Sequence, residues 1–302
     1  MSNPLAGQIA EFLEFIRFTR RYSQHTQDAY RRDLEQFAAY LTETHGEEVA
    51  TGLDVRHGHI RAWLAAAHAA SPLAATTRNR KTSALNSFFR HLQARGEVLQ
   101  NPTRLLHAVK TPERLPQFLK TEEAGNLLDK HPFGEDWDAR NHRIICELLY
   151  AAGLRRAELI GLRDGDLQSP ARLRVVGKGN KERLVPISAA MEQAIRDYQA
   201  EKAKHGIATE GGPMLVLENG RPLYATYVYR AVRRHLSDVC TLKKRSPHIL
   251  RHTFATHLLN NGANIQSIKE LLGHSSLAAT QIYTHNSIEM LKDIHRNHHP
   301  RG

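Results

Sequence analysis

The stretch Leu173-Arg-Val-Val-Gly-Lys-Gly-Asn-Lys-Glu-Arg-Leu-Val-Pro-Ile187 differs in character from the rest of this 302-residue chain. Two short β-prone runs flank a Gly-Lys-Gly-Asn turn, a pattern that is typical of a β-hairpin. The segments before and after it mostly carry apolar residues at intervals of three or four, as amphipathic helices do. We therefore predict a mainly α-helical fold with one small β-hairpin or sheet.

Residues 4 to about 108 have the periodicity of an all-helical unit. Helices are expected near residues 9–18, from an N-cap at Thr26, around residues 55–64, and from about Thr76 to Arg95. Gly96 would end the last of these, because glycine readily adopts the left-handed conformation that follows many helices.

Prolines at positions 102, 112 and 116 interrupt the helical periodicity, since proline restricts both itself and the preceding residue. We place a domain linker at residues 109–117, between a helical domain of residues 1–108 and a second domain of residues 118–302. In the second domain, helices are expected from Thr121 and over about residues 141–152, before Gly153.

The composition indicates a cytoplasmic protein and leaves its partner open. No stretch approaches the roughly 18 apolar residues of a membrane span, and the N-terminus does not resemble a secretory signal. Cys146 and Cys240 lack metal-ligand spacing, so we expect buried thiols and no metal site. The net charge is +11, with 13 Lys and Arg against 10 Asp and Glu through residue 108 and 29 against 21 beyond it. This excess suits a polyanionic partner, although a solvated basic surface would give the same count.

Four separated segments carry residues suited to phosphate chemistry: Gly153–Leu159, the hairpin with Lys178 at its turn, Ser246–Thr253, and Leu271–Tyr283. In the third, Ser246 as N-cap and Pro247 at the first helical position predict a helix start. His248 and Arg251, three residues apart, would share one face of that helix.

Together these segments resemble the tyrosine recombinase family, and most closely its Xer-type chromosome-dimer resolvases, across essentially the whole chain. The resemblance implies an N-terminal helical (SAM-like) core DNA-binding domain and a C-terminal tyrosine recombinase catalytic domain. It maps the catalytic residues of the family, in order, onto Arg155, Lys178, His248, Arg251, His274 and Tyr283.

The implied chemistry explains these residue types. Attack on a phosphodiester builds negative charge on the nonbridging oxygens, and the forked, permanently charged guanidiniums of Arg155 and Arg251 match it. Tyr283 would be the nucleophile that forms a 3′-phosphotyrosyl link, with His248 as the base that takes its proton. His274 would complete the clamp, and Lys178 would by family resemblance protonate the leaving 5′ oxygen. The reaction needs neither a metal nor a nucleotide cofactor.

Other basic residues are candidate DNA contacts. Arg78, Arg80 and Lys81 lie at the start of the fourth helix, where they form either a solvated face or a contact to the DNA backbone. Arg156, at a position where the family usually has an apolar or small residue, and Lys181 in the hairpin are further candidates.

The resemblance implies a recombinase that resolves chromosome dimers at a specific, dif-like site in duplex DNA during cell division. It would act as a homo- or hetero-tetramer with a related recombinase, and an FtsK-type DNA translocase would be an activating partner. A helix over about residues 287–295 would be a terminal cap or, as the resemblance implies, would dock on the neighbouring protomer. Two alternatives stay open: an integrase of a mobile element, which the compact length disfavours, and a DNA-binding protein without catalysis, which the complete residue set disfavours.

Overall fold

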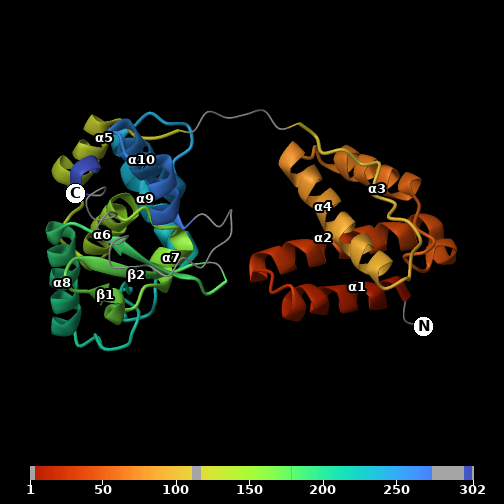
Figure 1. The fold of residues 1–302 in the computed structure, drawn as a ribbon, viewed down its shortest axis with the longest axis horizontal. Helices are drawn as coiled ribbons and strands as arrows, with labels where there is room; N and C mark the ends of the chain where they lie inside the picture. Colours follow the sequence, from red (N-terminus) through yellow and green to blue (C-terminus); the bar gives the residue numbers. More distant parts are fainter. Residues whose placement is uncertain (1–3, 111–116, 178, 274–295, 301–302) are drawn as a thin grey trace. The chain divides into compact units, whose positions relative to one another are not determined.

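The computed structural model describes residues 4–110, 117–177, 179–273 and 296–300. The chain divides into two compact units, Met1–Arg114 and Leu115–Gly302, each with its own hydrophobic core (Figure 1). The described residues are mainly helical with one three-stranded antiparallel sheet, which confirms the predicted fold class.

The first unit is all-helical, as its periodicity indicates. The second helix begins earlier than predicted, because its N-cap is Ser23, whose Oγ accepts a hydrogen bond from the backbone N–H of Thr26. Thr26 was therefore the wrong choice of cap. The elements are α1 (Pro4–Glu14), the π-helical turn η1 (Phe15–Thr19), α2 (Gln24–His45), the 3₁₀ turn η2 (Gly46–Val49), α3 (His57–Ala70) and α4 (Ala75–Ala94).

Aromatic side chains fill the core of this unit. Phe12 of α1 meets Phe88 of α4 edge to face with ring centroids 5.6 Å apart, and Phe37 of α2 meets Trp63 of α3 at 5.1 Å. All four are buried, so they bring a large apolar area out of water and also gain from favourable ring geometry. Each helix of the unit thus contributes to one shared core.

The second unit combines helices with the small sheet. Its elements are α5 (Thr121–Gly125), the π-helical turn η3 (Asn126–Lys130), α6 (Trp137–Ala151), α7 (Arg156–Gly161), the 3₁₀ turn η4 (Asp164–Asp166), β1 (Leu167–Gln168), β2 (Arg172–Val176), β3 (Glu182–Pro186), α8 (Ala189–Lys204), α9 (Ala225–Val239), α10 (Pro247–Asn260) and α11 (Ile265–Leu272).

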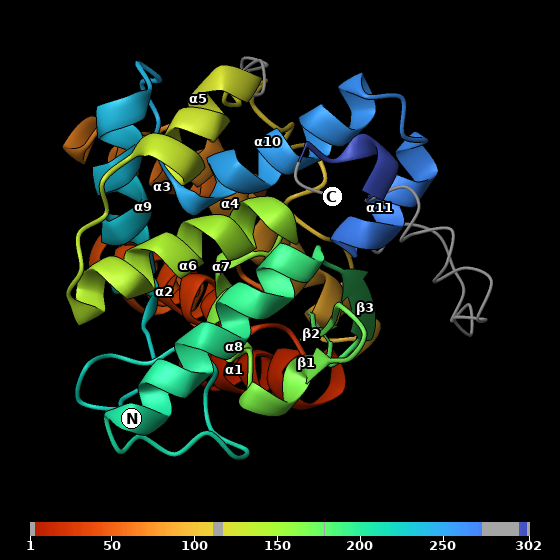
Figure 2. The same ribbon diagram turned by 90° about the vertical axis from the view of Figure 1, so that its left-hand side faces the viewer.

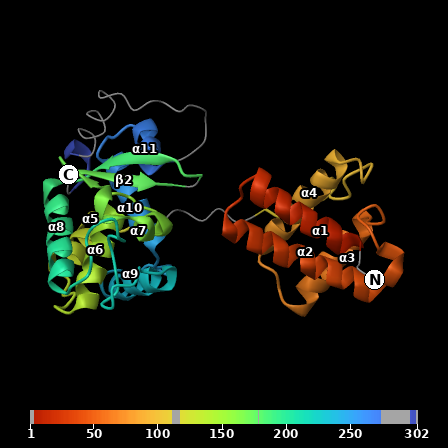
Figure 3. The same ribbon diagram turned by 90° about the horizontal axis from the view of Figure 1, so that it is seen from below.

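The predicted hairpin is formed by β2 and β3, with Leu173 opposite Val185 and Val175 opposite Arg183. The two-residue strand β1 extends it on the other side of β2, and a strand this short has no alternating pattern from which to predict it. Leu173, Val175 and Val185 are buried, while α7 packs on β2 and α11 on β3 (Figure 3). The hairpin therefore lies beside α7 on one strand and beside α11 on the other.

Helix α6 lies at the centre of the unit and packs against α8, α9 and α10 (Figure 2). Its buried residues include Cys146, and Cys240 at the end of α9 is also a buried free thiol, as predicted. None of the described helices combines the length and the hydropathy that a membrane span requires.

Candidate active site

The chain turns sharply between α6 and α7, and this turn places Arg155. Gly153 has φ +56°, and a β-carbon there would lie 2.5 Å from Phe254 Cδ1, so both the conformation and the space require glycine. Arg155 is the N-cap residue of α7, and its backbone N–H donates to Glu158 Oε2 at 2.8 Å. Its Nη1 donates to Glu158 Oε1 at 2.7 Å. One carboxylate therefore holds both the backbone and the guanidinium of Arg155.

Glu158 is the buried anion of an arginine cluster. Arg183 of β3 donates from Nη1 and Nη2 to its two oxygens at 2.9 and 2.8 Å, and these two side chains are 5% and 4% exposed. Arg251 Nη1 lies 3.6 Å from Glu158 Oε2. Burial alone would raise the pKa of Glu158, but Arg183 and Arg155 lower it to about 2 through their hydrogen bonds and charge. Glu158 is therefore ionised at neutral pH and offsets part of the surrounding positive charge.

Arg251 extends from α10 into the same cluster, and its side chain is 8% exposed. Its Nη1 donates to the carbonyl oxygen of Gly153 at 2.6 Å. Burial and the nearby Arg155 and Arg183 lower its pKa to about 10, against the opposing effect of Glu158. Arg251 thus remains a cation at neutral pH, held against the turn that places Arg155.

All three arginines also donate to the end of α11. Carbonyl groups there lack intrahelical partners and form the negative end of the helix dipole, so cations suit this position. The chain passes from this end directly into residues 274–295. The pairs are Arg183 Nε to Leu271 O at 2.9 Å, Arg251 Nη2 to Leu272 O at 2.6 Å and Arg155 Nη2 to Gly273 O at 3.2 Å.

His248 lies in the first turn of α10, one turn before Arg251, and its side chain is exposed. Ser246 and Pro247 start this helix as predicted, although the Ser246 hydroxyl makes no capping bond. The pKa of His248 lies below its ordinary value. The largest cause is that surrounding protein removes part of its hydration, and the nearby His252 and Arg251 act in the same direction. A neutral imidazole can accept a proton, which suits a general base.

Three of the predicted catalytic residues, Lys178, His274 and Tyr283, lie outside the described residues. The residues directly before two of them are described, and both lie against Arg183. A β-carbon on Gly177 would be 3.7 Å from Arg183 Nη1, and one on Gly273 would be 3.1 Å from the same atom. The chain therefore enters both segments beside the arginine cluster.

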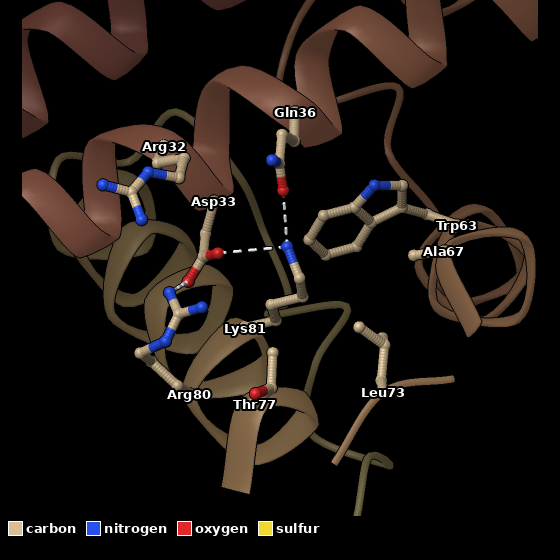
Figure 4. A pocket seen from close by; sticks show the side chains of 9 residues that line it. All are labelled: Arg32, Asp33, Gln36, Trp63, Ala67, Leu73, Thr77, Arg80 and Lys81. Atoms are coloured by element: carbon tan, nitrogen blue, oxygen red, sulfur yellow. Dashed lines mark hydrogen bonds and ion pairs between the residues drawn. The ribbon is translucent and has the colours of Figure 1, made fainter. Parts of the chain in front are cut away.

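The predicted DNA contacts at the start of α4 do not behave alike. Lys81 is 5% exposed, and its Nζ donates to Asp33 at 3.1 Å and to Gln36 at 2.6 Å, with the Trp63 ring centroid 4.9 Å away (Figure 4). Its ammonium is already occupied inside the unit, so the proposed phosphate contact of Lys81 does not fit this position. The reading of a solvated face does not fit it either.

The two arginines of that run, Arg78 and Arg80, differ from Lys81. Arg80 pairs with the second oxygen of Asp33, on the opposite side of the carboxylate from Lys81 (Figure 4). Asp33 can be fully buried because two cations neutralise it. Arg78 is exposed, and of the three it alone presents its side chain to solvent without an internal ion pair in the described structure. Arg32 lines the pocket drawn in Figure 4 together with Arg80 and Lys81, and it is also exposed.

The two candidate contacts of the second unit are at the surface. Arg156 is half-buried, and its Nη1 reaches the carbonyl oxygen of Ala225 at 3.5 Å. Lys181 is exposed, and its carbonyl oxygen accepts a hydrogen bond from Gly177 at 2.8 Å, which closes the hairpin. Their placement leaves the charged groups accessible to a polyanion.

Comparison with known proteins decides the family. The model of the phage integrase family matches residues 117–290, and the model of the phage integrase N-terminal SAM-like domain matches residues 9–96. The chain belongs to the phage integrase family, the tyrosine recombinases. It is thus an enzyme that cleaves and rejoins DNA through a phosphotyrosine intermediate.

Relatives of this recombinase match along nearly the whole chain. It is 39% identical to the tyrosine recombinase XerC of Pelobacter propionicus, over 99% of this chain and 97% of that one. It is 33% identical to XerC of Chlorobaculum tepidum, over 97% and 94%. Its fold is similar to that of the XerH site-specific recombinase bound to palindromic difH substrate, with a TM-score of 0.70 and 20% identity over 94% and 83% of the two chains.

Sequence reasoning on this recombinase assigned no role to Glu158 or Arg183. Glu158 lies three residues after Arg155, which is the spacing of side chains that meet on a helix. This spacing could have indicated the ion pair between them. Arg183 faces inward from a strand and finds its partners on α7 and α11. No local sequence pattern predicts these hydrogen bonds, because the partners of Arg183 are distant in the sequence.

Proposed function

We propose that this protein is a Xer-type recombinase that resolves chromosome dimers at a dif-like site in duplex DNA. The observation that carries the proposal is the convergence of Arg155 and Arg251 on Glu158 at the end of α11, where the chain continues toward Tyr283. The XerC relatives, 33–39% identical over nearly the whole chain, support the chromosomal role over that of a mobile-element integrase.

In this proposal Arg155 is the accessible half of the phosphate clamp, with a side chain that is 36% exposed. A guanidinium has five N–H donors, and in the described structure Arg155 uses one for Glu158 and one for Gly273. The remaining donors are free to bind the nonbridging oxygens of the scissile phosphate. Arg251, more deeply buried, contributes a charge that water screens weakly.

The remaining roles follow the family assignment. Tyr283 attacks the phosphorus, His248 accepts the phenol proton, His274 adds a donor to the phosphate, and Lys178 protonates the leaving 5′ oxygen. The bond energy is kept in the 3′-phosphotyrosyl link, so a 5′ hydroxyl of another strand can reverse the attack. We further propose that the recombinase works in the cytoplasm as a homo- or hetero-tetramer on two duplexes and is activated by an FtsK-type translocase.

A nicked suicide duplex with a dif-like sequence tests this function. When the cleaved strand loses a short fragment, religation is prevented, and the covalent protein–DNA adduct accumulates on a denaturing gel. We expect an adduct with the unaltered protein and none with Tyr283→Phe. The control is Tyr224→Phe, which alters an exposed tyrosine at the start of α9 and should leave the adduct unchanged.

An undiminished adduct from Tyr283→Phe would contradict the assignment of the nucleophile. Genome-wide mapping of cleaved sequences would separate the two biological roles. We expect cleavage at one chromosomal locus. Cleavage at the ends of a mobile element would contradict the role in chromosome resolution and indicate an integrase.

A further inference from the structure

Three histidines and an aspartate gather in the second unit, on elements that do not carry the arginine cluster. His131 follows η3, His142 is on α6, and His235 and Asp238 are on the last turns of α9. His131 Nε2 lies 2.7 Å from His235 Nδ1, and His235 Nε2 lies 3.0 Å from His142 Nδ1. Asp238 Oδ2 is 3.8 Å from His131 Nε2.

We propose that His131, His235 and Asp238 form a binding site for a divalent transition-metal ion, best suited to Zn²⁺, with water as the fourth ligand. One ligand atom from each residue lies within 4.8 Å of the other two. Ligand atoms of a tetrahedral zinc site are about 3.3 Å apart, given zinc–nitrogen distances of about 2.0–2.1 Å. The two imidazoles would separate by a fraction of an ångström from 2.7 Å, and the exposed Asp238 carboxylate would move closer from 3.8 Å.

The donor set selects the class of ion. Two imidazole nitrogens with one carboxylate suit zinc and its neighbours in the first transition row, whereas Mg²⁺ and Ca²⁺ prefer oxygen ligands alone. Imidazole must be neutral to bind a metal.

The surroundings of His235 resemble the outer shell of a metal site. If His235 Nδ1 binds the ion, its Nε2 carries the proton and donates to His142 Nδ1, and such hydrogen bonds orient metal-binding histidines. The Phe133 ring lies 4.5 Å from the His235 ring and 5.1 Å from the His131 ring, which covers one side with apolar surface. His142 has a positioning role, because its hydrogen bond to His235 Nε2 orients the His235 ring.

The site is reachable from solvent. The side chain of His131 is 10% exposed and that of Asp238 is 55% exposed, so an ion and its water ligand can enter between them. The bound ion would join the end of η3 to α9, two elements far apart in the sequence that already pack together. Its effect would be to stabilise the second unit, because a ligand that binds only the folded state shifts the unfolding equilibrium.

Zinc titration of the untagged full-length protein, after dialysis against a chelator, tests the proposal. We expect one zinc ion per chain by calorimetry and an unfolding midpoint that rises with zinc concentration. Cobalt(II) should give the intense visible absorption of a tetrahedral site. His131→Gln and Asp238→Asn should each abolish or strongly weaken binding, and His142→Gln should weaken it about 10- to 100-fold.

Two control variants separate this site from the other histidines of the chain. His298→Gln alters the histidine-rich end of the chain, and His205→Gln alters a histidine at the end of α8. Both should keep the stoichiometry and the cobalt spectrum. Zinc binding that survives His131→Gln, binding that is lost in His298→Gln, or no binding at all would overturn the proposal and leave a hydrogen-bonded histidine chain. Circular dichroism of each zinc-free variant confirms that it is folded.

Discussion

At Glu158 one carboxylate accepts hydrogen bonds from Arg155 and Arg183 and lies 3.6 Å from Arg251. Removing one partner of a buried ion pair leaves an uncompensated charge, which costs more than the pair itself contributes. Glu158 therefore has a positioning role for the arginines that we propose to bind the phosphate.

Glu158→Gln should lower both stability and cleavage. We expect the free energy of unfolding to fall by on the order of 3 kcal/mol at neutral pH. The pKa of Glu158 is lowered from 4.5 to about 2, so its stabilising effect is complete above about pH 4.5 and is lost as the pH falls toward 2. Denaturation curves of the two proteins should therefore converge over that range. The control is Glu182→Gln, an exposed carboxylate on β3, and a pH-independent difference would contradict the prediction.

Gly153→Ala should destabilise the turn that places Arg155. Its β-carbon would meet Phe254 at 2.5 Å in addition to the unfavourable positive φ, which we expect to cost about 1–3 kcal/mol. The carbonyl that receives Arg251 would also shift, so cleavage should slow. Gly206→Ala has the same sign of φ but open space around it, so thermal unfolding of the two variants separates the clash from the strain.

At the scale of elements, α4 shows how one helix start can serve two purposes. Its first turns carry Arg78 outward and Lys81 inward, toward α2 and α3, where Asp33 and Trp63 receive it. Residues three apart share a helix face, so the difference comes from the packing: α2 and α3 cover Lys81, whereas Arg78, one turn earlier, is exposed.

Arg78→Ala and Lys81→Met should therefore have opposite signatures. Loss of Arg78 should reduce the slope of log K against log salt for DNA binding by about 1, without a change in stability. Loss of Lys81 should leave that slope unchanged and lower the stability of the first unit by roughly 1–3 kcal/mol, since Asp33 loses one of its two cations. A reduced slope for Lys81→Met with unchanged stability would return Lys81 to the DNA interface.

At the scale of the whole molecule, both units are basic and each has its own core. The first carries 15 Lys and Arg against 11 Asp and Glu, and the second 27 against 20. Positive charge in both units fits a protein whose two parts each contact a polyanion.

The fragment Leu115–Gly302 should fold and bind DNA with lower affinity and a smaller salt slope than the full chain. The physical reason is that the phosphate contacts expected of the first unit are lost, while the second unit has a hydrophobic core of its own. Binding isotherms at several salt concentrations measure both quantities, after circular dichroism has shown the fragment to be folded. An equal slope for fragment and full chain would mean that the first unit does not touch phosphates.

Much of this protein could be predicted from the sequence. Helical periodicity, the hairpin turn and the Ser246-Pro247 helix start are properties of neighbouring residues, and the structure confirms them. The family followed from four motifs in order, and it is shown by the comparison. The start of α2 and the strand β1 were missed, because caps compete over a few residues and a two-residue strand has no period.

What only the tertiary structure decided is which charged groups meet in the interior. Lys81 and Asp33 are 48 residues apart, and Glu158 and Arg183 are 25 apart, so no local pattern links them. The energy of a charge depends on its burial and on its partners, and both are properties of the packed chain. The sequence alone therefore determined the class of fold and the family of chemistry, and the packing determined which cations are exposed and which pair with buried carboxylates.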